Sequence, residues 1–409
     1  MADTKVFAYT GRDSAGKVVN GRLDGSSEAS VVSKLRSMSV SPISIKEARV
    51  GSGLNMELSV SGFGKHVGLK DLAVMSRQMA TMIGAGLSLI RSLGILADQT
   101  ENKELARVLG LVGGEIERGL SLSESMGKHP TVFPPLMIHM IRAGEAGGFL
   151  DTSLNGAADN FEADVKLRDT IKSALTYPVI VLIMAIVAVI GMLIFIVPVF
   201  EQMFAGLGGE LPLPTQILVV LSRSMIWMGP LLAVSIVVFI FWWRVNKHTD
   251  RVRSVVDPLK LKLPVFGTLF TKVAVARFAR NFSTMMASGV PILQSLSIVG
   301  DTSGSYVIEQ ALKKVQESVR QGNSVSAPLA LEPVFPNMVV QMIAVGEDAG
   351  SMEVMLSKVA EFYEAEVEAT TKALTSLIEP LMIAFIGVVI GGMIVALYLP
   401  VFSIFEQIK

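Results

Sequence analysis

Three long apolar stretches constrain the fold of this chain more than any other feature of its sequence. They cover residues 174–200, 217–243 and 381–405, and their interiors are uncharged apart from Arg223 near the start of the second. At about 1.5 Å per helical residue, each can cross a hydrocarbon core roughly 30 Å thick. They also explain why 51% of the 409 residues are hydrophobic, a high fraction for a soluble protein. The sequence therefore predicts three transmembrane helices.

The positions of basic residues predict the orientation of these spans. Before the first span and after the second lie Lys166, Arg168, Lys172, Arg244, Lys247, Arg251 and Arg253. The connection 201–216 has two glutamates and no basic residue. Because lysine and arginine are enriched in cytoplasmic loops, we expect the N-terminus in the cytosol. The connection 201–216 and the tail 403–409 are then external.

An internal repeat is the second constraint. Four landmarks of the first copy recur 202 positions later, so that Gly144 corresponds to Gly346. They are Phe-Pro, Gly-Glu-x-x-Gly, a single Pro and Pro-Val-Phe. Upstream landmarks are displaced by 203 positions, as from Arg77 to Arg280, so one deletion between Gly322 and Phe335 explains both shifts. Each copy is a soluble segment followed by one outward span. An additional span must return the chain, and 217–243 is that span.

Helical periodicity predicts the fold of each copy. Leu72, Met75 and Met79 form an apolar stripe at helical spacing, the second copy repeats it, and Gly119 and Gly322 are placed to end helices in the left-handed conformation. The predicted fold is mostly α, a polytopic membrane protein with two repeated cytosolic helical bundles, three transmembrane helices and a small α/β N-terminal domain. The predicted segments are an accessory domain at 1–48, a flexible linker at 49–68, cytosolic domains at 69–173 and 253–373, and spans at 174–200, 217–243 and 374–402.

The two Gly-Glu-x-x-Gly segments are the first candidate sites. They contain Gly144, Glu145 and Gly148 in the first copy, and Gly346, Glu347 and Gly350 in the second. One interpretation is structural: the glycines give backbone freedom and the acid favours the N-terminus of the following helix. The other interpretation is a polar contact with a partner or another protomer, through a cation if several oxygens converge. A lone carboxylate is weak support for a metal site.

Residues within the predicted spans form the second group of candidates. Gly387 and Gly391 make a Gly-x-x-x-Gly pattern in the third span that permits close approach of another helix, although glycine is also common in membrane helices. The prolines at the ends of the first and third spans are Pro178, Pro198, Pro380 and Pro400. We expect the first of each pair to kink its helix and the second to end its span.

Motifs for catalysis and cofactor binding are missing from the sequence. No Gly-x-x-x-x-Gly-Lys-Ser/Thr phosphate loop occurs, the four histidines lack zinc-ligand spacing, and there is no cysteine. Charges balance at 36 basic against 36 acidic residues, so no overall field favours nucleic acid. We expect no enzymatic activity, no catalytic residue, no metal, no cofactor and no nucleic-acid partner.

These landmarks together resemble the type II secretion system F family of inner-membrane platform proteins in type II secretion and type IV pilus machines. The resemblance rests on Phe7-x-Tyr9, both Gly-Glu-x-x-Gly segments, Tyr177-Pro178 and both Pro-Val-Phe segments, with Glu379 replacing the tyrosine in the second copy. It implies a multi-pass protein of the bacterial inner membrane that contacts a hexameric secretion ATPase, pilins or pseudopilins and other inner-membrane assembly proteins. It also implies homo-oligomers in which the platform couples the ATPase to extraction and polymerisation of pilin-like subunits.

Two other classes of function remain open from the residues alone. A small-solute transporter or channel needs ionisable groups along a pathway at membrane depth, yet Arg223 and Glu379 lie near span ends. A membrane-bound enzyme needs converging polar groups, and the sequence shows no such set. The pilus or secretion platform is the leading hypothesis.

Overall fold

The computed structural model describes residues 5–12, 18–25, 28–37, 41–47, 67–205, 211–247 and 249–407. The chain divides into two compact units, Met1–Phe63 and Gly64–Lys409. Residues 13–17, nearly all of the linker predicted at 49–68, and residues 206–210 lie outside the described residues.

The first unit contains three strands and one helix in its described residues. They are β1 (Lys5–Arg12), β2 (Val18–Gly25), α1 (Glu28–Ser37) and β3 (Ser41–Glu47). The strands form an antiparallel sheet in the order β2-β1-β3. Phe7 of β1 and Val31 and Leu35 of α1 are buried, as expected for a helix that covers one face of a small sheet.

The second unit consists of two equivalent sets of helices, which confirms the internal repeat. The first half contains α2 (Leu69–Gly84), α3 (Leu89–Gln99), α4 (Lys103–Glu117), α5 (Leu122–Gly127), α6 (Pro135–Gly147) and α7 (Leu150–Gly191). The second half contains α11 (Phe266–Ala287), α12 (Ile292–Thr302), α13 (Tyr306–Arg320), α14 (Ser326–Leu329), α15 (Asn337–Asp348) and α16 (Met352–Gln407). Each helix of the first half has a counterpart, in the same order, in the second.

The predicted apolar stripes form the core of each half. Met75 and Met79 are buried in the first half, and Phe278 and Phe282 are buried in the second. The rings of Phe278 and Phe335 lie 4.9 Å apart, so the stripe of α11 packs on the loop that precedes α15. The predicted helix ends are also confirmed, since Gly119 and Gly322 have φ values of 96° and 91°.

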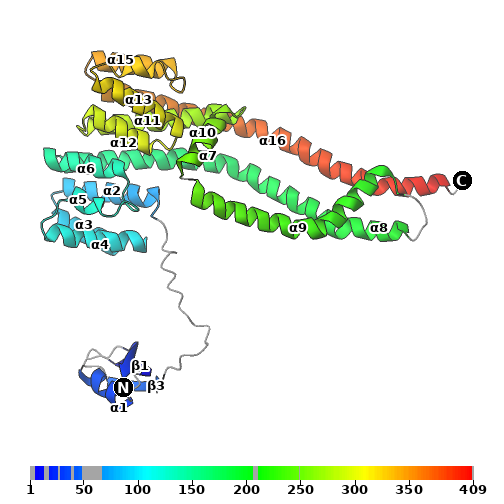
Figure 1. The fold of residues 1–409 in the computed structure, drawn as a ribbon, viewed down its shortest axis with the longest axis horizontal. Helices are drawn as coiled ribbons and strands as arrows, with labels where there is room; N and C mark the ends of the chain where they lie inside the picture. The colour runs from blue at the N-terminus through cyan, green and yellow to red at the C-terminus, as the bar shows by residue number, and fades with distance from the viewer. Residues whose placement is uncertain are drawn as a thin grey trace. The chain divides into compact units, whose positions relative to one another are not determined.

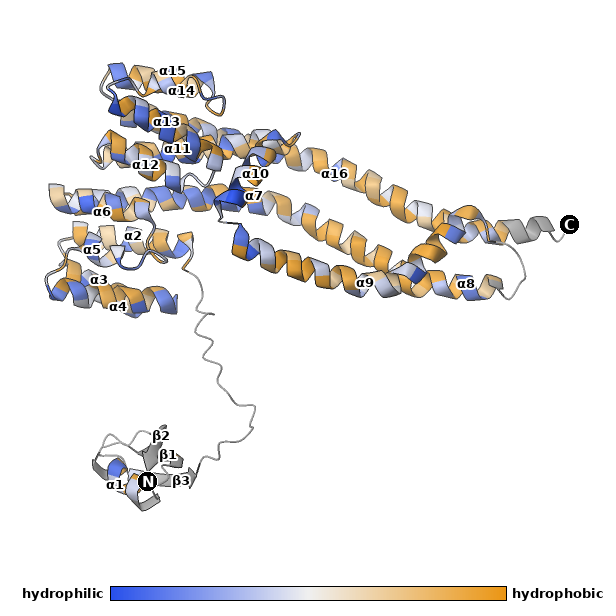
Figure 2. Cartoon of the chain, viewed as in Figure 1, coloured by the Kyte–Doolittle hydropathy of each residue, from blue (hydrophilic) through white to orange (hydrophobic). Residues whose placement is uncertain are grey.

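Among the described residues, three helices are long and apolar enough to cross a membrane, the same number as the predicted spans. The first consists of α7, a π-helical turn (Met192–Ile196) and α8 (Val197–Ala205), the second is α9 (Leu213–Asn246), and the third is α16. Within the second unit, the bundles of both halves lie at one end and the long helices run away from them (Figure 1). The apolar colouring covers α9 and the distal parts of α7 and α16 (Figure 2).

The helices extend beyond the ends that hydropathy predicts for the spans. α8 continues to Ala205 and α9 begins at Leu213, so much of the connection predicted as a loop at 201–216 is helical. Charge and hydropathy report where a segment meets water, whereas a helix ends where its backbone hydrogen bonds end. The predicted end of the first span near Glu201 and the predicted start of the second span after Gln216 therefore do not coincide with the ends of the helices.

The short helix α10 (Asp250–Lys262) connects α9 to the second half. It packs on α11 and α13, where Arg253 forms an ion pair with Glu309 at 2.9 Å and Asp257 accepts a hydrogen bond from the amide of Tyr306 at 3.0 Å. Between α10 and α11, Val265 has φ 71° and ψ −52°, and the amide of Phe266 donates to the carbonyl of Pro264 at 2.8 Å. This is a γ-turn, a strained conformation for a β-branched residue.

Candidate functional site: the two Gly-Glu corners

Residues 144–148 and 346–350, here called the Gly-Glu corners, join α6 to α7 and α15 to α16. In the first corner, both carboxylate oxygens of Glu145 accept backbone hydrogen bonds. The donors are the amides of Leu122 and Ser123, at 2.5 and 3.1 Å. These are the first two amides of α5, and the third, from Glu124, donates to the hydroxyl of Ser121 at 3.2 Å. Glu145 therefore completes the N-terminal cap of α5.

The second corner repeats this arrangement. Glu347 accepts from the amides of Val325 and Ser326 at 2.7 and 3.2 Å, and the amide of Ala327 donates to the Ser324 hydroxyl at 3.3 Å. The Ser326 hydroxyl adds a further bond to Glu347 at 3.0 Å. This extra donor is present in the copy where Ala327 replaces the capping Glu124, whose side chain faces the Ser121 amide in the first copy. Glu145 and Glu347 thus have the same structural role, which is to cap the N-terminus of a short helix.

The glycines of each corner are required for two different reasons. A Cβ on Gly144 would lie 2.4 Å from the Ser153 hydroxyl, and a Cβ on Gly346 would lie 2.9 Å from the Cα of Met352. These first glycines let the end of α6 or α15 approach the following helix closely. The last glycines, Gly148 and Gly350, have φ values of 76° and 62°, a region that favours glycine.

This geometry corrects one detail of the structural interpretation. The acid was expected to favour the N-terminus of the helix that follows it, but Glu145 and Glu347 cap the short helix that precedes their own. Local spacing could not reveal this contact because more than twenty residues separate the carboxylate from its donors. Ser121 and Glu124 form a capping box at the start of α5, and this Ser-x-x-Glu spacing is the signal in the sequence that a helix begins there.

A second repeated contact ties each bundle to its long helix, and no motif in the sequence indicates it. Arg77 of α2 donates from Nε and Nη2 to the carboxylate of Glu162 on α7, both at 3.0 Å, and also pairs with Asp159. Arg280 of α11 donates to both oxygens of Glu364 on α16, at 2.9 and 3.0 Å. The hydrogen bond from Arg77 holds the pKa of Glu162 below its usual value. Such bidentate pairs fix orientation as well as distance.

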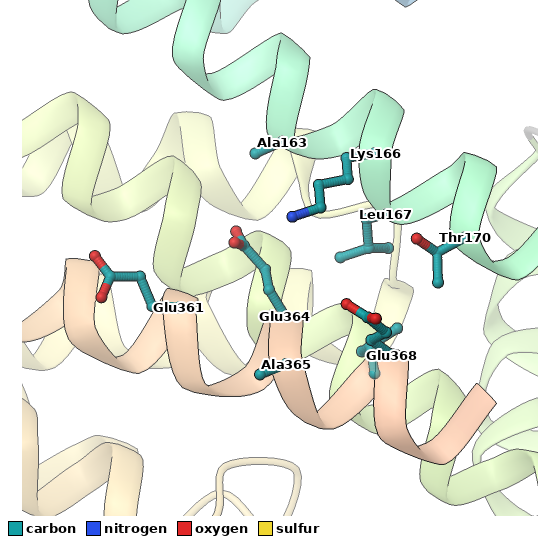
Figure 3. A pocket seen from close by; sticks show the side chains of 9 residues that line it. Ala163, Lys166, Leu167, Thr170, Glu361, Glu364, Ala365 and Glu368 are labelled. Atoms are coloured by element: carbon teal, nitrogen blue, oxygen red, sulfur yellow. The ribbon is translucent and has the colours of Figure 1, made fainter. Parts of the chain in front are cut away.

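The two halves contact each other through α7 and also through α6, where His139 and Gln294 of α12 are hydrogen-bonded at 2.9 Å. Asn160 donates to the Asn281 side chain at 2.9 Å, and Asp164 pairs with Arg277 at 2.8 Å. Nearer the membrane, a cavity of about 190 Å³ lies between α7 and α16. Figure 3 shows the Lys166 side chain of α7 directed toward Glu364 of α16 across this cavity, which Glu368 also lines.

The prolines of the Pro-Val-Phe segments lie inside helices rather than at helix ends. α8 continues past Pro198 to Ala205, and α16 continues past Pro400 to Gln407. A proline lacks the amide that would bond a carbonyl in the preceding turn. The Thr215 hydroxyl donates to the carbonyl of Ala396, four residues before Pro400. Because α9 supplies this bond, the helix need not end there.

The same compensation occurs at the first Pro-Val-Phe segment. The π turn that ends at Ile196 shifts hydrogen bonding to residues five apart, so the partner of the Leu193 carbonyl would be Pro198. The Ser222 hydroxyl donates to that carbonyl instead, at 2.5 Å. Thr215 and Ser222 both belong to α9, so the return helix satisfies a freed carbonyl in each of the other two spans.

The remaining candidates in the spans make no comparable contacts. Pro178 and Pro380 lie within the unbroken helices α7 and α16, and the kinks expected there stay a prediction. A Cβ on Gly387 or Gly391 would meet no atom within 4 Å, so this face of α16 is open. Among the described residues, no group of three or more His, Cys, Asp or Glu side chains is arranged to hold a metal ion.

Comparison with known proteins assigns the family. The profile described as "Type II secretion system (T2SS), protein F" matches residues 75–198 and 278–400, one segment in each half, and the profile of the N-terminal domain of protein F matches residues 1–46. Similar proteins include the "Type IV pilus assembly protein PilC" of Thermus thermophilus, 41% identical over 98% of both chains.

Two further relatives extend this range. The protein of the same name from Myxococcus xanthus is 39% identical over 99% of this chain and 96% of its own. The "Type II secretion system protein F" of Vibrio cholerae is 30% identical over 97% of both chains. The two profile matches coincide with the two structural halves that carry the Gly-Glu corners, and the relatives align over nearly their whole length. The chain therefore belongs to the type II secretion system protein F family.

Proposed function

We propose that this chain is an inner-membrane platform of a type IV pilus or type II secretion machine, through which a cytosolic hexameric ATPase drives extraction and polymerisation of pilin-like subunits. The family consists of platform proteins of such machines, and the relatives are named for pilus assembly and secretion. The chain is a multi-pass inner-membrane protein with three apolar helices. Its proposed partners are the ATPase, pilins or pseudopilins, other inner-membrane assembly proteins and further copies of itself, and its role is structural rather than catalytic.

One structural observation carries the coupling part of this proposal. Each soluble bundle is packed on a helix that continues without interruption into a membrane-spanning segment, α7 from Leu150 to Gly191 and α16 from Met352 to Gln407. At about 1.5 Å per residue, the 56 residues of α16 extend roughly 84 Å. A rotation or tilt of a bundle is therefore transmitted along a continuous helix into the bilayer.

The proposed topology places both bundles and the N-terminus in the cytosol and the C-terminus outside. Two features of the sequence support it, the basic residues that flank the first two spans and the repeat that requires a return span. Cysteines introduced at Gly208 and Ser254 should react with an impermeant maleimide from opposite sides of the membrane. Reaction from the same side would refute this topology.

The proposal is tested by interrupting the helical rods. Four glycines inserted after Lys172 in α7, or after Lys372 in α16, should abolish pilus assembly or secretion, because glycine costs about 1 kcal/mol per residue in a helix relative to alanine. Membrane insertion and copurification of the ATPase should persist. The matched control inserts the same glycines after Lys247, where α9 has already ended.

Normal output from the α7 and α16 variants would contradict transmission through the rods. Failure of the wild-type chain to recover an ATPase or pilin-like subunits, together with solute flux by the purified chain in liposomes, would favour the transporter or channel instead. A loss of output in the control equal to that in the two rod variants would show that the insertion acts by general disruption.

A further inference from the structure

The two halves of the chain contact each other through different surfaces, one on α7 and one on α11. The surface of α2 that corresponds to the one on α11, and the surface of α16 that corresponds to the one on α7, are left exposed. Within the chain, the face of α7 that carries Gly156, Asn160 and Leu167 packs on α11 and α16 of the second half. The face of α11 that receives it carries Arg277, Asn281, Thr284 and Ser288. Asn160 is only 3% and Asn281 only 9% exposed, so the contact is well covered.

The counterparts of the receiving face lie on α2 and are exposed. Subtracting the repeat offset of 203 positions converts the receiving residues of α11 into Val74, Gln78, Thr81 and Ala85. All four are exposed, and Val74 is an apolar side chain with 50% of its surface accessible. We call these four residues the open face of α2.

The counterparts of the inserting face lie on α16 and are also exposed. Adding the downstream offset of 202 positions converts Gly156, Asn160 and Leu167 into Lys358, Phe362 and Ala369. All three are exposed, and Phe362 has 46% of its surface accessible where its counterpart Asn160 has 3%. We call these three residues the open face of α16.

We propose that the open face of α16 in one copy of this chain packs on the open face of α2 in a second copy, repeating between chains the contact that joins the two halves within a chain. The inference rests on the proposed function only in taking a homo-oligomer as the working form. Phe362 then lies opposite Gln78 and Thr81, as Asn160 lies opposite Asn281 and Thr284 inside the chain.

The topology of the repeat makes this arrangement compatible with one membrane. Because both halves send their long helix in the same direction, the halves are related by an axis along the membrane normal, as in other parallel repeats. Applying the same step again keeps the spans of the second chain in the same bilayer and in the same orientation. A head-to-tail contact of this kind closes into a ring when its rotation permits.

The substitutions between the halves predict where the contact between chains is strongest. The polar pair Asn160–Asn281 becomes Phe362 opposite Gln78, and burial of the exposed phenylalanine favours association. Gly156, whose Cβ position lies 3.6 Å from Thr284 and 3.9 Å from Ser288, becomes Lys358, whose ammonium pairs with Glu361 at 2.8 Å. The contact is therefore tightest around Phe362 and looser at Lys358.

Cysteine crosslinking tests the contact directly, since the chain has no native cysteine. Full-length chains carrying Gln78→Cys and chains carrying Phe362→Cys, with different tags, are coexpressed and oxidised in native membranes. We expect a disulfide between differently tagged chains, no dimer when either variant is expressed alone, and a ladder beyond the dimer when one chain carries both substitutions. In the matched control Leu111→Cys, at another exposed helical position on α4, replaces Gln78→Cys and should give no product.

A charge substitution provides a second measurement. The repeat places Val74 opposite Glu366 of the other chain, as Arg277 lies opposite Asp164 within the chain. Glu366 already pairs with Lys272 of its own chain at 2.7 Å, so Val74→Arg should raise the yield of the Gln78→Cys and Phe362→Cys crosslink by adding a second cation beside this carboxylate, and Val74→Glu should remove most of it. Equal yields for the two variants would overturn the proposed register.

Three other outcomes would also overturn the inference. Crosslinking of either single variant with itself would indicate a two-fold contact. Absence of the mixed product, although both thiols react with a maleimide, would show that the two faces do not meet. Protection of the Phe362→Cys thiol only when the ATPase is present would assign this face to the ATPase. The crosslink is measured in membranes whether or not pili form. Crosslinking without any link to pili or secretion therefore refutes the platform and leaves the contact standing.

Discussion

Replacing Glu145 distinguishes a structural cap from a contact with a partner. The carboxylate accepts from the amides of Leu122 and Ser123, and Glu145→Ala removes both bonds while α5 remains packed on α6. A hydrogen bond to a charged group contributes about 1.5–3 kcal/mol, and loss of an N-cap side chain costs about 0.5–2 kcal/mol. Water reaches the half-exposed site and replaces part of the interaction, so we expect local opening of α5 to become about 2 kcal/mol easier.

Hydrogen exchange of the full-length chain in lipid nanodiscs measures this opening. Since each 1.4 kcal/mol is a factor of ten, Glu145→Ala should accelerate exchange of the α5 amides about 30-fold. Glu145→Gln keeps one acceptor oxygen without the charge, and we expect about 1 kcal/mol, or about fivefold. Glu347→Ala should have the same effect on the amides of Val325 and Ser326, which shows whether the two copies share the role.

The control and the refuting result follow from the same experiment. Glu117→Ala removes an exposed carboxylate from the last turn of α4 and should leave exchange of α5 unchanged. If Glu145→Ala abolished pilus or secretion output without changing exchange in α5, the carboxylate would act on a partner and the capping argument would fail.

Three further sets of substitutions test separate parts of the structure. Thr215→Val together with Ser222→Ala leaves two carbonyls in the spans without donors, and we expect the free energy of unfolding to fall by about 1–3 kcal/mol per site. The measurement is the unfolding temperature in detergent, which should be lower. An unchanged temperature would show that these hydroxyls are dispensable. Val265→Gly should relieve the γ-turn, which costs on the order of 1 kcal/mol, and raise that temperature, whereas a fall would show that the valine side chain matters more than the strain. Gly346→Ala should destabilise the chain because the new Cβ would lie 2.9 Å from the backbone of α16. Gly387→Ala should not, because its Cβ would meet no atom within 4 Å. Equal effects would show that Gly346 is not needed for the close approach of α15 to α16.

Patterns that repeat along the chain could be identified before the structure was known. Membrane spans depend on the mean hydropathy of about twenty residues, and core stripes depend on a spacing of three or four, so both are local properties. The duplicated landmarks gave the two halves and their order, and Gly119 and Gly322 adopt the left-handed conformation expected of them. Residue type and position were sufficient at these sites because the relevant neighbours lie within one or two helical turns.

Contacts between distant segments could not be predicted in the same way. Nothing in the spacing of Glu145 indicated that its carboxylate caps α5, because that contact depends on how α6 packs beside α5. Pro198 and Pro400 were expected to end their spans, since a proline removes a backbone donor. Whether a helix continues depends on another donor, and Thr215 and Ser222 supply it from α9.

The sequence by itself determined that this chain has three spans, two equivalent bundles and the landmarks of its family, since hydropathy, periodicity and duplication are written along the chain. Only the tertiary structure decided which residues at equivalent positions of the two halves are buried and which are exposed. Asn160 is buried against Asn281 while its counterpart Phe362 is exposed, because a contact that joins the end of one half to the start of the next uses each face once. A single chain therefore retains one unused face at each end.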